Sequence, residues 1–186
     1  MIPGERRFAR DEQSRNTRAA GDGGAYTGSR GSDTEREHPM TTKADFTPQE
    51  WELILEGPTG AGMIVITAQR GGMLRETVSI AKAYVQARQQ HGQSELLDEI
   101  VAVKPKLDHT RYRSPEELKE HSLGHLRDAV ALLQGKVTPQ ELDEYKRFII
   151  TLADKVAEAH REHGHGQEAV SASEQAAIAA ITEALG

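Results

Sequence analysis

The sequence contains no cysteine at any of its 186 positions. The chain therefore has no disulfide, no thiolate zinc or iron–sulfur site, and no cysteine nucleophile. Its apolar runs, such as residues 63–66, are far shorter than the roughly 20 residues that a membrane-spanning helix needs. The N-terminus also lacks the apolar core of a signal peptide. These absences predict a protein of the cytoplasm that is not inserted in a membrane.

An excess of positive charge is missing as well. The chain has 23 basic and 29 acidic residues, which gives a net charge of −6. Such a balance disfavours nucleic acid as the partner. The length of 186 residues and the hydrophobic content of 37% are enough for one ordinary core. We therefore expect a single folded domain.

The first 39 residues differ in composition from the rest. They are rich in glycine and charge, and after Ile2 they have almost no aliphatic side chain to bury. Such a segment cannot offset its ordering entropy, so we expect a disordered tail over residues 1–45 and a helical domain over 46–186. Met40, followed by Thr41, resembles a second start site, which would make the tail a start-site extension.

A repeated helix-start signal marks the rest of the chain. A hydroxyl residue is followed three positions later by glutamate, which is the capping box of a helix N-terminus. Phe46 and Trp51 flank the first box as a hydrophobic staple. The signals predict an all-α, single-domain bundle of six or seven helices. The four boxes are Thr47/Glu50, Ser114/Glu117, Thr138/Glu141 and Ser171/Glu174.

Apolar spacing predicts where the helices run. Gly57-Pro58 predicts an interruption, and the segment 63–67 would suit a buried strand or a buried helix. We expect a helix there because its neighbours are helical. The expected helices are 48–56, 59–69, 73–90, a short one after Ser94, 115–134, 139–163 as the central element, and 172–185.

The same spacing predicts which faces are buried. In the helix 73–90 we expect Leu74, Val78, Ala81 and Val85 to face the core, because they lie four, three and four residues apart. In the helix 115–134 the expected core face is a longer stripe. Its members are Leu118, Ser122, Leu126, Ala129 and Leu133.

The segment 57–62, Gly-Pro-Thr-Gly-Ala-Gly, resembles the opening of a phosphate-binding loop. That loop needs a lysine and then a hydroxyl residue after its last glycine, and Met63 and Ile64 stand in those places. We favour close helix packing as the role of these glycines. A small-molecule or nucleotide binder at this turn remains an alternative function.

Two histidine clusters are candidate metal sites. His121 and His125 lie four apart on one helix face with Glu117, a spacing that can chelate a metal. His160, His163 and His165 lie at the end of the long helix, where polar side chains also satisfy the last carbonyl groups. Packing is the alternative role of both clusters. A histidine-based divalent-metal or metal-stress protein is the second candidate function.

A basic segment around Tyr112 is the only concentrated positive patch outside the tail. Its charges can hold a phosphate group or an acidic partner, and a solvated loop is the simpler interpretation. Nucleic-acid binding is disfavoured because neighbouring acids dilute the patch. The basic residues are Lys104, Lys106, His109, Arg111 and Arg113.

The stretch from Phe46 to Trp51, the small-residue segment 57–73 and the closing Ser171-x-x-Glu174 helix together resemble a group of uncharacterised bacterial helical proteins. The resemblance covers residues 46–185. It implies an all-helical fold and brings no activity and no site residues. The last helix alone is similar to tellurite-resistance TerB-like domains, whose paired acidic motifs are missing here.

No catalytic motif emerges from these patterns. The chain has no Gly-x-Ser-x-Gly nucleophile elbow and no His-Glu-x-x-His motif. The strong motifs are devices for capping and packing helices. We therefore expect a non-enzymatic bacterial protein without a cofactor, which associates with itself or with a protein partner.

Overall fold

The computed structural model describes residues 40–68, 73–89, 94–108, 110–161 and 171–186. These residues form α-helices and no strand, which confirms the all-α prediction. No helix in them is both long and apolar enough to cross a membrane. The expected tail, residues 1–39, lies outside the described part. The elements are the 3-10 helix η1 (Lys43–Asp45) and the helices α1 (Pro48–Ala68), α2 (Met73–Gln89), α3 (Glu95–Ala102), α4 (Pro115–Gln134), α5 (Pro139–Arg161) and α6 (Ala172–Leu185).

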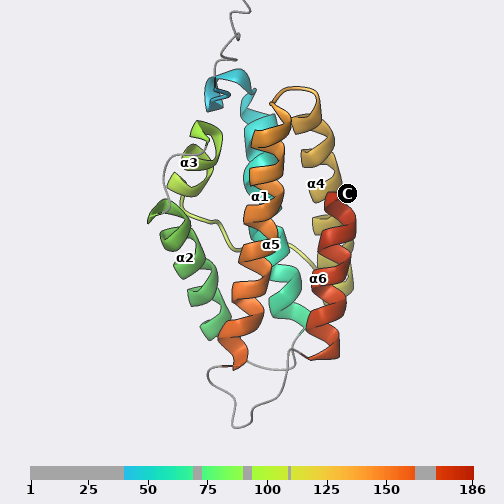
Figure 1. Cartoon of the computed structure of the whole chain (residues 1–186). Helices are drawn as coiled ribbons and strands as arrows, with labels where there is room; N and C mark the ends of the chain where they lie inside the picture. Colours follow the sequence, from blue (N-terminus) through green and yellow to red (C-terminus); the bar gives the residue numbers. More distant parts are fainter. Residues whose placement is uncertain (1–39, 69–72, 90–93, 109, 162–170) are drawn as a thin grey trace, which may run out of the picture. The chain divides into compact units, whose positions relative to one another are not determined.

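Helices α1 and α5 form the middle of the bundle. In Figure 1, α5 lies in front of α1, with α2 and α3 on one side and with α4 and α6 on the other. Helix α5 contacts every other α-helix, as expected for a central element. Helix α1 shares this position, because it contacts α2, α4, α5 and α6 and all of residues 61–66 are buried.

The capping boxes form where the sequence predicts them. Thr47, Thr138 and Ser171 each receive the backbone N–H of the glutamate three residues on, and that glutamate accepts the cap's own N–H. Ser114 likewise accepts the backbone N–H of Glu117, but the Glu117 carboxylate accepts the N–H of Arg113, at 2.8 Å, in place of the N–H of Ser114. The predicted starts of α1, α4, α5 and α6 are therefore all confirmed.

The folded domain begins earlier than expected. Thr41 is buried, and both its N–H and its hydroxyl donate to the carboxylate of Glu141 at 2.8 and 2.9 Å. The same carboxylate caps Thr138. Burial raises the pKa of Glu141, but the hydrogen bonds from Thr138 and Thr41 outweigh it and lower the pKa. Residues 41–45 thus belong to the bundle, with their backbone fastened to α5.

The expected interruption at Gly57-Pro58 is wrong, because α1 continues through both residues. A proline inside a helix has no N–H for the carbonyl group four residues earlier, which here is Ile54. The hydroxyl of Tyr145 in α5 donates to that carbonyl oxygen at 2.9 Å. Tyr145 is buried, and burial raises the pKa of its phenol, so the group keeps its proton. The hydroxyl of Tyr145, 91 residues from Ile54 in the chain, therefore replaces the missing donor.

The three glycines of the segment 57–62 let neighbouring helices approach α1. A Cβ atom at Gly57 would lie 2.2 Å from the Tyr145 hydroxyl, and one at Gly62 would lie 2.6 Å from Ile80 Cδ1 in α2. At Gly60 it would lie 3.1 Å from Ser122 in α4. Close helix packing, the favoured interpretation of the glycines, is confirmed.

The predicted core face of α2 is wrong. Val78 and Val85 are about half exposed and Ala81 is exposed, while Ile80, Ala83 and Tyr84 are buried. The side chain of Leu74 lies outside the described part. The helix carries two apolar stripes, and the one with the aromatic residue faces the core. In α4, by contrast, the five expected core residues are all buried.

We predict that Gly57→Ala destabilises the bundle by about 2 kcal/mol, the usual range for overpacking a core. The added methyl group would displace the Tyr145 hydroxyl from the Ile54 carbonyl. Denaturant unfolding measures the change.

Gly124→Ala is the matched control, because a Cβ there meets nothing within 4 Å. It is expected to stabilise α4 by about 0.5–1 kcal/mol through helix propensity. Equal effects of the two substitutions would contradict the packing role of Gly57.

Candidate functional site

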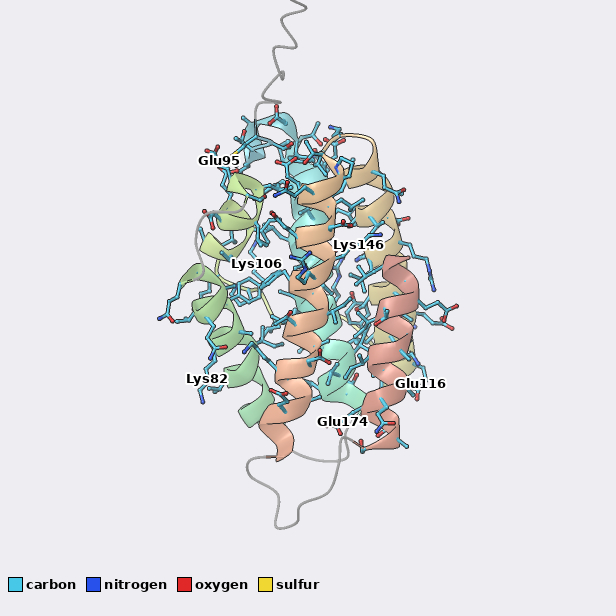
Figure 2. The ribbon with its side chains drawn as sticks, in the orientation of Figure 1. Lys82, Glu95, Lys106, Glu116, Lys146 and Glu174 are labelled. Carbon is cyan, nitrogen blue, oxygen red and sulfur yellow. The ribbon has the colours of Figure 1, made fainter. Side chains whose placement is uncertain are left out.

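A cleft of about 250 Å³ opens between α1, α4 and the connection 103–113 that links α3 to α4. We call it the loop cleft. Helix α1 contributes Glu56, Thr59 and Gly60 to its wall, so part of the glycine segment does border a cavity. Lys106, labelled in Figure 2, belongs to the connection on the other side.

The floor of the loop cleft is apolar. Met63 of α1, Ile100 of α3 and Leu118 of α4 line it, and each is buried. They come from core stripes of three helices, so the floor is an extension of the hydrophobic core. Ligand clefts of proteins commonly combine such a floor with a few polar groups.

The hydroxyl groups of two largely buried side chains supply the polar part. Tyr84 of α2 and Ser122 of α4 line the cleft and are only 2% and 5% exposed. Neither hydroxyl has a hydrogen-bond partner among the described residues. Burial raises the pKa of Tyr84, so its hydroxyl remains a donor. Among the described residues, neither hydroxyl oxygen is a buried atom lacking a partner, so both reach the surface of the cleft, where they can bond to a ligand or to water.

A charge-paired network forms one edge of the cleft. One carboxylate oxygen of Glu56 accepts a hydrogen bond from Arg111 Nη1 at 2.6 Å, and the other oxygen lies 2.8 Å from His125 Nδ1. Glu56 and His125 are each about one quarter exposed. The network ties the loop to α1 and α4, so Arg111 serves the wall of the cleft.

Arg88 of α2 holds the start of the connection by hydrogen bonds. The Arg88 guanidinium donates to the carbonyl oxygens of Val101 and Ala102, which lie at the C-terminal end of α3. Further along, Asp108 accepts the N–H and the hydroxyl of Thr110 at 2.9 and 2.7 Å. The connection is therefore held to α2 at its start by Arg88 and to α1 further along by the Arg111–Glu56 pair, which keeps the mouth of the cleft in place.

Within the described residues, the predicted basic patch leaves two lysines in the cleft without an ion pair, and Arg113 lies outside the cleft lining. Arg111 pairs with Glu56, and the backbone of Arg113 bonds to Glu117. His109 lies outside the described part. Lys104 and Lys106 are exposed, line the cleft and form no ion pair with any described residue. Their two charges are available to a ligand at the mouth.

The structure describes the first cluster of candidate metal residues, His121 and His125. His121 packs between Tyr112 and His125, with ring centroids 5.6 and 6.2 Å apart. His125 pairs with Glu56, and Glu117 caps a helix start. Among the described residues, no group of three or more histidine, aspartate or glutamate side chains has a metal-binding arrangement.

The second histidine cluster is not described. The side chain of His160 and all of His163 and His165 lie outside the described residues. The metal site at the end of α5 stays a prediction.

No family model, curated protein or solved structure matches this chain. The resemblance to uncharacterised bacterial helical proteins therefore stays a prediction. Function has to be argued from the geometry alone.

Sequence reasoning missed the two residues that distinguish this cleft. Ser122 was expected only as a core residue, although a hydroxyl inside an apolar stripe is a signal that a polar partner is needed. Tyr84 was not singled out, because the other stripe of α2 was expected to face the core. Their common position in one cleft, from α2 and α4, could not be predicted from either segment alone.

Proposed function

We propose that the protein binds a small anionic molecule with an apolar body in the loop cleft. The observation that carries the proposal is the pair of hydroxyl groups of Tyr84 and Ser122, which line the cleft on largely buried side chains and bond to no described residue. An acceptor group of the ligand would satisfy them, and its apolar part would cover the floor.

Three acidic residues, Glu52, Glu56 and Asp108, line the cleft together with Lys104, Lys106 and Arg111, and the proposal takes the two lysines as the groups that meet the ligand. Lys104 and Lys106 have no ion-pair partner among the described residues, while Glu56 is engaged with Arg111 and His125. A carboxylate or phosphate group at the mouth would lie near two unpaired ammonium groups. In this proposal the protein binds its ligand and catalyses no reaction. The proposed location is the bacterial cytoplasm, with which the absence of cysteine is in keeping.

We predict that benzoate and phenyl phosphate raise the melting temperature of the full chain by binding the folded state, whereas neutral benzyl alcohol of similar shape does so far less. Replacing both lysines, Lys104→Glu with Lys106→Glu, should weaken benzoate binding about tenfold, and added salt should weaken it in wild type. Calorimetry and thermal shift measure both.

Lys119→Glu is the control for either single substitution, Lys104→Glu or Lys106→Glu, because it makes the same charge change at an exposed position of α4 outside the cleft. It should leave benzoate binding unchanged. If benzyl alcohol binds as well as benzoate, or if all three lysine changes act alike, the proposal is wrong.

A second candidate function is association of the protein with a second copy of itself. The outer face of α2 carries Val78, Ala81 and Val85, all exposed, at intervals of three and four residues. Figure 2 shows Lys82 of α2 pointing away from the bundle. Val78 and Val85 lie four residues before and three after it, so they share that outer side.

A second copy is the occupant that this face suits best. The spacing of three and four is that of a coiled-coil seam, and the small Ala81 lets a helix of the same kind approach. The same patch on two copies makes a self-complementary contact. One face of a 17-residue helix buries less than the roughly 1,200 Å² of a stable interface, so the association is expected to be weak.

We predict that the full chain dimerises with rising concentration and that Val78→Glu with Val85→Glu abolishes the dimer. Sedimentation velocity over a concentration series measures this. The control Ala131→Glu places one carboxylate on an exposed position of α4 and should leave the dimer intact. A monomer at every concentration, or a dimer unaffected by the two valine changes, would rule out this interface.

A further inference from the structure

A second cleft, of about 440 Å³, lies between α2, α3 and α5. We call it the α5 cleft. It shares no lining residue with the loop cleft. Leu97 of α3 and Phe148 of α5 supply apolar surface, and Ala83 and Ala87 of α2 keep the opposite wall shallow.

An incompletely paired carboxylate lines this cleft. Glu144 of α5 is 5% exposed, and one of its oxygens accepts a hydrogen bond from Gln140 at 3.2 Å. The other oxygen, Oε2, is buried and has no hydrogen-bond partner among the described residues. A carboxylate has room for about four hydrogen bonds, and leaving it unpaired away from water is costly.

Residues of opposite charge line the same cleft. Arg147 and Lys155 of α5 are lining residues, and neither forms an ion pair with a described residue. The cleft therefore presents two carboxylates, Glu144 and Asp98, together with two cations and an apolar wall. Its size is within the range of small-molecule clefts, about 300–1,000 Å³.

We propose that the α5 cleft binds a small molecule through a primary ammonium group, which donates to Oε2 of Glu144. An ammonium has three donors and a positive charge, so it supplies what the buried oxygen lacks. The carbon chain of the ligand packs against Leu97 and Phe148. A carboxylate on the same ligand would face Arg147 and Lys155, so amino-acid zwitterions belong to this class. The site is separate from the proposed function and does not depend on it.

Three matched probes test the chemistry on the full chain by calorimetry and by amide chemical shifts. They are leucine, 3-methylbutylamine, which lacks the carboxylate, and 4-methylpentanoate, which lacks the amine. At least one ammonium probe is expected to bind at millimolar concentration and to shift amides of Gln86 and Thr151, which line the cleft. The two ammonium probes also distinguish a plain amine from a zwitterion as the preferred ligand.

The variant Glu144→Gln keeps the size of the side chain and removes its charge. It should weaken binding of the ammonium probes by about tenfold or more. It should fold as wild type does, because it removes a buried charge with an unpaired oxygen. Asp143→Asn is the control, since it makes the same charge change at an exposed neighbour outside the cleft.

Three results would overturn the proposal. The first is that neither ammonium probe binds at millimolar concentration. The second is that 4-methylpentanoate binds as tightly as they do. The third is that Glu144→Gln and Asp143→Asn bind the ammonium probes equally well.

Discussion

The hydrogen bond from Tyr145 to the carbonyl group of Ile54 is the contact on which the arrangement of the bundle depends. Pro58 removes the donor that would normally serve this carbonyl, and Gly57 leaves room for the phenol to reach it. Both atoms are buried, so water cannot replace the missing donor without opening the core. The interaction therefore joins α1 to α5 and keeps α1 a single helix through its proline.

A continuous α1 has consequences for the clefts. Its glycine face lets α2, α4 and α5 come close, and at Gly60 the nearest neighbour is Ser122. The same stretch borders the loop cleft, so the residues that allow close packing also bring the Ser122 hydroxyl to the cavity. On the far side of α5, small residues of α2 leave the second cleft open. Packing of the middle helices thus determines where a ligand can enter.

The sequence predicts those parts of the structure that depend on neighbours in the chain. The four helix starts follow from hydroxyl and glutamate residues three positions apart, and the apolar stripe of α4 follows from one clear period. The face of α2 was mistaken because it has two apolar stripes, and only the partner helix selects between them. The continuity of α1 was missed because the donor for Ile54 comes from Tyr145, 91 residues away.

The candidate sites were even less predictable, since each cleft combines side chains from three or more segments. The basic residues near Tyr112 did indicate one wall of the loop cleft. Their pairing could not be read from the sequence, because Glu56 lies 55 residues from Arg111. No sequence pattern indicated that Glu144 lines a cleft, since an acidic residue near a helix start is ordinarily solvated.

The most direct test of the central contact is a double-mutant cycle of Tyr145→Phe and Pro58→Ala, followed by denaturant unfolding. In wild type, Tyr145→Phe leaves the Ile54 carbonyl unpaired and should cost about 2 kcal/mol. In the Pro58→Ala background the helix regains its own N–H donor, so the same change should cost about 1 kcal/mol less. An equal cost in the two backgrounds would show that Tyr145 does not replace the donor that Pro58 removes.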